Sequence, residues 1–160
     1  VSGAPTTPEP AADHGFALER TFHRLDGEAV DIATAKQNER YVVLLTVTEA
    51  KPQFGRVALT DYVPAGFEID NPRLISSANT GGLSWITQGA APVHTGFRDN
   101  RFVAAFDRKA DSPVVFRVAY MVRAVSPGNY VLPQALVEDM YRPDRFGRTD
   151  TGTVKVTPRK

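Results

Sequence analysis

The sequence has no cysteine and almost no excess of charge of either sign. Without cysteine the chain can form no disulfide bond, no thiol nucleophile and no thiolate metal site. Its 19 basic and 18 acidic residues give a net charge of +1, so no overall positive field attracts nucleic acid or an anionic membrane surface. We therefore expect no nucleic-acid partner.

Long apolar segments are also absent. No uninterrupted apolar run approaches the roughly 18 residues that a membrane-spanning helix needs. The chain has 160 residues, which suits one domain, and a chain of this size buries about 70% of its unfolded surface. We therefore expect a single domain with a sizeable core.

Proline and glycine are concentrated at the N-terminus, where large apolar side chains are scarce. Residues Val1–Gly15 contain three prolines and two glycines, and Val1 is their one large apolar residue. Such a segment buries too little apolar surface to offset the entropy of ordering it. We expect a flexible linker or tail over residues 1–15, an interdomain linker rather than a tag remnant, and a single domain over residues 16–160. The chain is then one part of a longer protein.

From Phe16 onward the dominant period of apolar residues is two. In Val114–Val125 the even positions are apolar while Arg117 and Arg123 fall on the other face, as in a half-buried strand. Tyr41–Glu49 has apolar residues on both faces, which is typical of a central strand. Further strands are expected at residues 16–24, 56–62, 66–69, 95–98, 101–107, 130–141 and 152–156.

Turn-forming residues separate these strands. Asp99-Asn100 predicts a tight hairpin, because Asp and Asn tolerate positive φ. About eight short strands without a long helical period favour an all-β fold, an antiparallel β-sandwich, with one short helix near residues 71–86. The predicted core consists of Phe16, Leu18, Phe22, Val43, Leu45, Val47, Phe102, Phe106, Phe116, Val118, Tyr120 and Val122.

Candidate catalytic and metal-binding residues are few and scattered. The histidines at positions 14, 23 and 94 show no spacing that would bring two of them to one metal ion. Glu138 and Asp139 are neighbours on a predicted strand, so they point to opposite faces and cannot share a proton. No nucleophile elbow, phosphate loop or calcium loop is present in the sequence. We expect no enzyme, no metal site and no cofactor.

Two features near residue 140 need separate interpretations. Arg142, Arg145 and Arg148 form a basic cluster that would suit an anion or an acidic neighbour, but a solvated turn is the favoured interpretation. Met140 and Tyr141 precede it. They either cap the end of the core or project from an edge into a partner, since Met adapts to irregular surfaces and Tyr joins an apolar body to a polar tip. The pattern alone favours the core cap.

Three long stretches resemble one known family. They are DYVPAGFEIDNPRL at residues 61–74, FRDNRFVAAFD at residues 97–107 and AYMVRAVSPGNYVLPQALVEDMYRP at residues 119–143. All three are similar to the C-terminal macroglobulin-like domain, the last domain, of bacterial alpha-2-macroglobulins. The resemblance runs from about Phe16 to Val156 and implies a macroglobulin-like, fibronectin-III-like sandwich.

The resemblance also implies a function. The family's parent molecule is a periplasmic protease inhibitor, anchored to a membrane as a lipoprotein, whose bait region is cleaved by the attacking protease. In members that carry a thioester, the last domain shields that bond with a Met-Tyr pair, which in this sequence corresponds to Met140 and Tyr141. The implied partners are the thioester domain and other macroglobulin domains of the parent, its target proteases, and a periplasmic penicillin-binding protein.

An alternative function rests on the shorter motif VPAGFEI at residues 63–69. This motif alone is also similar to the repeat domains of bacterial surface adhesins, which implies a stand-alone adhesive or scaffold β-sandwich of a cell-surface protein. The sequence of the upstream coding region would separate the two, because a Cys-x-x-Gln thioester motif there supports the inhibitor and tandem sandwich repeats support the adhesin.

Overall fold

A computed structural model describes residues 9–70 and 93–159 of the chain. Within these ranges the chain forms β-strands and no helix, and the helix expected near residues 71–86 lies outside the described residues. The strands are β1 (Ala12–His14), β2 (Ala17–His23), β3 (Ala29–Val30), β4 (Thr34–Lys36), β5 (Arg40–Thr48), β6 (Gly55–Tyr62), β7 (Phe67–Asp70), β8 (His94–Arg98), β9 (Arg101–Arg108), β10 (Val115–Ala124), β11 (Gly128–Leu132), β12 (Ala135–Asp139), β13 (Phe146–Arg148) and β14 (Gly152–Thr157).

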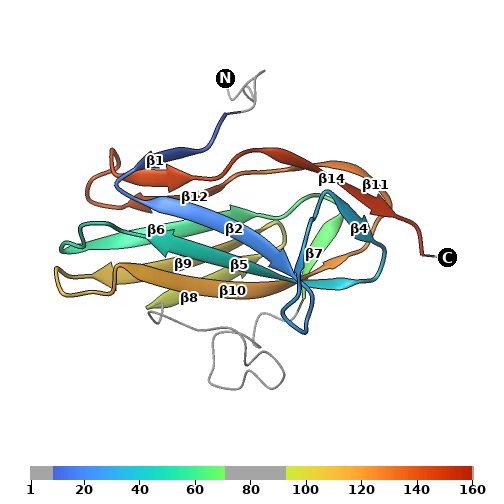
Figure 1. The fold of residues 1–160 in the computed structure, drawn as a ribbon, viewed down its shortest axis with the longest axis horizontal. Helices are drawn as coiled ribbons and strands as arrows, with labels where there is room; N and C mark the ends of the chain where they lie inside the picture. The colour runs from blue at the N-terminus through green and yellow to red at the C-terminus, as the bar shows by residue number, and fades with distance from the viewer. Residues whose placement is uncertain (1–8, 71–92, 160) are drawn as a thin grey trace.

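The strands form three sheets that run along the long axis of the molecule (Figure 1). The first has the order β1-β13-β12-β6-β9-β8, the second β3-β2-β5-β10-β7, and the third β11-β14-β4. Strand pairing is antiparallel except between β14 and β4, which are parallel. The predicted all-β antiparallel sandwich is confirmed.

Most of the core lies between the six-stranded and the five-stranded sheets, and Ala35, Val154 and Val156 of the third sheet complete it. Phe106 of β9 packs against Phe116 of β10 with ring centroids 4.8 Å apart, and Phe102 stacks on Tyr120 at 4.7 Å, so each pair joins the two sheets. The predicted core residues are buried, except for Leu18 and Val118, which are partly buried and pack against the core. Alternation of apolar residues therefore identified the inner faces correctly.

The expected count of about eight strands is too low. Residues 130–141 were expected to form one strand, but Pro133 separates β11 from β12, and these two strands lie in different sheets. Proline has no N–H to donate to a sheet, so the chain changes sheets there. The short strands β1, β3, β4 and β13 have two or three residues each, too few to show a period.

The expected boundary between tail and domain at residue 15 is also corrected. Strand β1 pairs with β13, and the His14 ring stacks on Phe146 with centroids 4.7 Å apart. Just before β1, the Ala11 N–H donates to Asp150 Oδ1 over 2.5 Å. Main-chain pairing and one ring contact thus hold β1 in place, although its own side chains bury little apolar surface. The ordered domain therefore begins upstream of Phe16.

The Asp99-Asn100 hairpin is confirmed, because Arg98 and Arg101 are paired across it. Among the described residues, however, Asn38 is the one non-glycine residue with a positive φ, at 69°. The hairpin therefore forms without the left-handed backbone conformation on which its prediction rested.

A buried polar cluster links the two large sheets near the middle of the core. Arg20 of β2 donates from Nη1 to Asp61 Oδ1 of β6 over 2.5 Å, and the Tyr120 hydroxyl of β10 donates to Asp61 Oδ2 over 2.5 Å. Arg20 Nη2 also donates to the Pro133 carbonyl over 2.7 Å. Burial, followed by the negative charge of Asp61, holds the pKa of Tyr120 well above its ordinary value.

The raised pKa of Tyr120 predicts a loss of stability at alkaline pH. A group whose pKa is higher in the folded state contributes stability that is complete below its unfolded pKa and is lost as the pH rises through the folded pKa. For tyrosine this loss begins near pH ~10. Urea unfolding between pH 8 and pH 11.5 should show a steeper fall in the free energy of unfolding for wild type than for Tyr120→Phe. Equal slopes for wild type and Tyr120→Phe would contradict the assignment.

Candidate functional site

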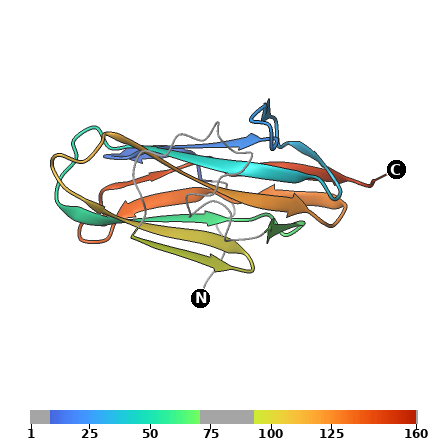
Figure 2. The same ribbon diagram turned by 90° about the horizontal axis from the view of Figure 1, so that it is seen from below.

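Met140 and Tyr141 lie in the turn between β12 and β13, at one end of the sandwich. The segments that join β5 to β6 and β9 to β10 lie at the same end, opposite the C-terminus (Figures 1 and 2). The Met140 side chain is 55% exposed and that of Tyr141 is 62% exposed. The core-cap interpretation is therefore wrong, because neither side chain is buried in this domain.

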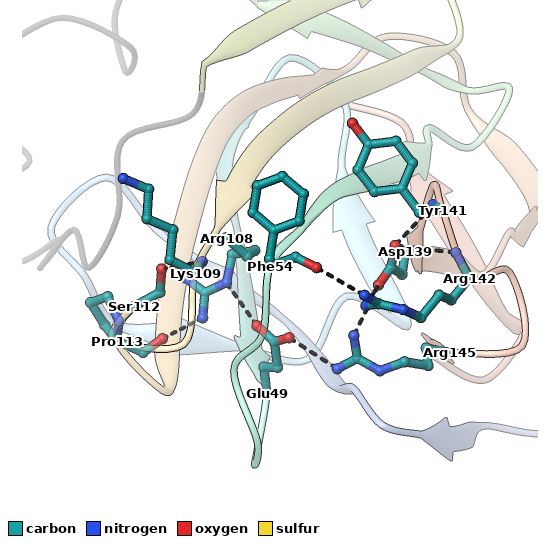
Figure 3. Close-up of polar contacts among 10 residues, drawn as sticks. All are labelled: Glu49, Phe54, Arg108, Lys109, Ser112, Pro113, Asp139, Tyr141, Arg142 and Arg145. Carbon is teal, nitrogen blue, oxygen red and sulfur yellow. Dashed lines mark hydrogen bonds and ion pairs between the residues drawn. The ribbon is translucent and has the colours of Figure 1, made fainter.

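Phe54 lies beside Tyr141, although it comes from a different part of the chain. The two rings are nearly parallel, with an interplanar angle of 12° and centroids 6.5 Å apart (Figure 3). Phe54 immediately precedes β6 and is 72% exposed. We call Phe54, Met140 and Tyr141 the exposed patch. Phe54 was not predicted from the sequence, where its one signal is a large aromatic side chain in a turn segment, next to Gly55.

The backbone of the Met140-Tyr141 turn is fixed by a buried carboxylate. Asp139 is 1% exposed, and its Oδ1 accepts the N–H of Tyr141 over 2.9 Å and that of Arg142 over 3.3 Å. Its Oδ2 accepts from the Arg142 side chain at 3.0 Å and from Arg145 at 2.9 Å. The Met140 N–H donates to the Arg56 carbonyl over 2.8 Å. The turn therefore has a defined conformation.

A second buried carboxylate extends this network into the core. Glu49 follows β5 and is fully buried; it accepts from Arg108 Nε over 2.8 Å and from Arg145 Nη2 over 3.0 Å (Figure 3). Arg108 also donates to the Pro113 carbonyl, and its guanidinium lies over the Phe116 ring at 4.3 Å. Arg145 therefore connects the core network to the carboxylate that fixes the turn.

The basic cluster is consequently not a solvated turn, and that interpretation is corrected. The Arg145 side chain is 16% exposed and bridges the two buried carboxylates. Arg142 pairs with Asp139, and Arg148 pairs with Glu9. The alternative interpretation of the cluster, in which its arginines contact acidic neighbours, agrees with these ion pairs. Sequence alone offered no means of pairing Arg145 with Glu49, because nearly a hundred residues separate them.

The neighbouring carboxylates Glu138 and Asp139 do not form a pair on one face of β12. Glu138 is half-buried and Asp139 is buried, so the two fall on opposite faces of β12, as expected. In the ranges that the structure covers, no group of three or more His, Asp or Glu side chains is placed to hold a metal ion, and no helix is long and apolar enough to cross a membrane. The site therefore exposes an apolar patch. Beneath it lies a polar base, the network of ion pairs and hydrogen bonds that Asp139, Arg142, Arg145 and Glu49 form.

Comparison with known proteins gives the family. Residues 15–144 match the bacterial alpha-2-macroglobulin MG10 domain. The chain is 33% identical to alpha-2-macroglobulin of Xylella fastidiosa over 98% of its own length and 10% of the relative's. For the Escherichia coli protein the identity is 33%, over 89% of this chain and 9% of the relative. The chain thus spans about a tenth of the curated relatives that it matches.

Solved structures agree with the sequence comparisons. The structure of Salmonella alpha-2-macroglobulin reacted with methylamine matches with a TM-score of 0.82 and 31% identity, over 98% of this chain and 10% of that one. A native Escherichia coli fragment spanning domain MG7 to the C-terminus matches with a TM-score of 0.81 and 28% identity, over 98% of this chain and 25% of that one. The resemblance drawn from three sequence motifs is confirmed, and the chain belongs to the bacterial alpha-2-macroglobulin MG10 domain family.

Proposed function

We propose that this domain covers the thioester of a neighbouring domain in a bacterial alpha-2-macroglobulin, through Met140 and Tyr141, until cleavage of the bait region releases it. The observation that carries the proposal is the exposure of both side chains, 55% and 62%, on a turn that a buried carboxylate holds in place. Exposed side chains with large apolar surfaces, on a turn whose backbone is held by hydrogen bonds, suit contact with another domain.

The chemistry of a thioester explains why such a cover is needed. Water and amines attack the acyl carbon, so an unused inhibitor has to keep the bond dry. An aromatic ring and a thioether exclude water without presenting a nucleophilic amine. Fixing the turn in advance lowers the entropy cost of docking, and an interface of moderate size is released when bait cleavage shifts the domain. The Salmonella alpha-2-macroglobulin structure was determined after reaction with methylamine, which supports amine-reactive chemistry in a full-length relative.

The proposal has consequences for the rest of the molecule. The thioester domain and other macroglobulin domains of the parent would be the direct neighbours, and proteases would be the targets of the parent. The parent would act in the periplasm as a membrane-anchored lipoprotein. A contact with a periplasmic penicillin-binding protein is a further proposal, for which no residue of this domain is assigned.

The experiment that tests shielding uses the full-length parent. Tyr141→Ala should release a free thiol with methylamine about tenfold faster than wild type without any protease, the factor that corresponds to losing ~1.4 kcal/mol of contact. The unfolding free energy of the 160-residue chain should change by less than about 1 kcal/mol, because Tyr141 is exposed there. Tyr62→Ala, at the far end of β6, is the matched aromatic control and should react like wild type. Equal thiol release in Tyr141→Ala and wild type would contradict the proposal.

A further inference from the structure

Phe54 is the most exposed large apolar side chain in the described part of the chain, at 72%. Single exposed apolar residues are common on protein surfaces and carry no functional meaning by themselves. Phe54 differs because it stacks on Tyr141, a residue of a separate turn, and because Met140 lies next in sequence to that tyrosine. The two turns therefore bring the rings of Phe54 and Tyr141 together on the surface.

The polar base fixes Phe54 and Tyr141 relative to one another. Arg142 donates from Nη2 to the Phe54 carbonyl over 3.2 Å and from Nη1 to Asp139 Oδ2 over 3.0 Å. The same aspartate accepts the N–H of Tyr141. Gly55 follows Phe54 against this carboxylate, since a Cβ there would lie 3.2 Å from Asp139 Oδ2. One guanidinium and one carboxylate therefore hold both backbones (Figure 3).

The energetics favour a contact function for this arrangement. A buried ion pair often stabilises a fold no better than apolar residues of similar size would. Stability alone therefore does not explain why charged groups lie under the patch. Aromatic side chains held in advance on a rigid base are typical of residues that dominate binding interfaces, because they bury a large area at a small entropic cost. The base is therefore well suited to presenting two rings to a partner.

We propose that Phe54 is a third contact residue of this domain, and that its ring docks with Tyr141 against an apolar surface of a neighbouring domain in the parent chain. The occupant is another domain of the parent because the chain matches only about a tenth of the length of its curated relatives. The inference rests on the proposed contact through Met140 and Tyr141 and extends it to a second turn.

A reporter thiol tests the inference, because this chain has no cysteine of its own and peptide mass spectrometry distinguishes the reporter from the cysteines of other domains, that of the thioester included. Phe54→Cys, Tyr141→Cys and Tyr62→Cys are each made in the full-length parent and in the 160-residue chain, and maleimide labelling of each site is timed by peptide mass spectrometry. Labelling at residue 54 should be about tenfold slower in the parent, the change expected if the covered arrangement accounts for about 90% of molecules. The same unfolding midpoint as wild type shows that each variant is folded.

The outcomes separate this inference from the proposed function. Protection at residues 54 and 141, with none at residue 62, supports both. Protection at residue 141 alone overturns the role of Phe54 and leaves the Met140-Tyr141 contact standing. Protection at residue 54 alone supports docking through Phe54 and contradicts the proposed role of Tyr141. Protection at no position, or equal protection at all three, overturns both, because crowding would then account for any slowing.

Discussion

Replacing Phe116 with alanine should lower the free energy of unfolding by about 3–5 kcal/mol. The side chain is fully buried, its ring packs on Phe106 at a centroid distance of 4.8 Å, and the Arg108 guanidinium lies over its face at 4.3 Å. Removing the ring leaves a cavity between the sheets, and the buried Arg108 guanidinium loses the aromatic face that it packs against. Chemical denaturation of the 160-residue chain measures the loss directly.

The control for this substitution is Val131→Ala on β11. Its side chain is 61% exposed, so the change should stay within about 0.5 kcal/mol. A loss below about 1 kcal/mol for Phe116→Ala would show that the cavity closes or that the ring contributes little. A comparable loss for both variants would instead point to a general sensitivity of the fold to truncation.

The same residues show how much of the fold was predictable. Alternation in β10 puts Phe116 on the inner face and Arg117 on the other, because successive side chains on a strand point in opposite directions. That rule needs only local sequence, and it placed the long strands and nearly all of the core. It failed where a strand is two or three residues long, as in β3 and β13, or where a proline moves the chain from one sheet to another.

The candidate site was predictable only in part, and strand β12 shows why. Ala135, Val137 and Asp139 are buried on one face, so a continuing strand would place Tyr141 on that same inner face. The strand ends at Asp139, because its carboxylate accepts the Tyr141 N–H and starts a turn. An aspartate that ends a strand in this way looks, in sequence, like any other acidic residue. The family resemblance, and not the period, pointed to a contact role for Met140 and Tyr141.

Phe54 and the ion network were missed for a related reason. Glu49, Arg108 and Arg145 come from three separate segments, and charged residues near turns are usually solvated. Only the folded topology brings these segments to one end of the sandwich (Figure 1). Long-range pairing of charges leaves no periodic trace, so neither composition nor spacing identifies it.

Arg145→Met should lower the free energy of unfolding by about 3–5 kcal/mol, the usual loss when one partner of a buried ion pair is removed. Arg145 donates to Glu49 over 3.0 Å and to Asp139 over 2.9 Å, and its guanidinium lies over the Phe16 ring at 4.8 Å. Methionine keeps much of the side-chain volume but leaves both buried carboxylates with one donor fewer. Denaturant unfolding of the 160-residue chain measures the loss.

Two matched variants show whether bridging, rather than charge alone, carries this loss. Arg142→Met removes an arginine whose side chain is 40% exposed, so it should lower stability by only about 1 kcal/mol. Arg145→Lys retains the positive charge but lacks the planar fork that reaches two carboxylates at once, so it should recover only part of the loss seen for methionine. Full recovery with lysine would contradict the bridging role. A loss below about 1 kcal/mol for Arg145→Met would show that the bridge between Glu49 and Asp139 contributes little to stability, and that Asp139 and Arg142 hold the turn without it.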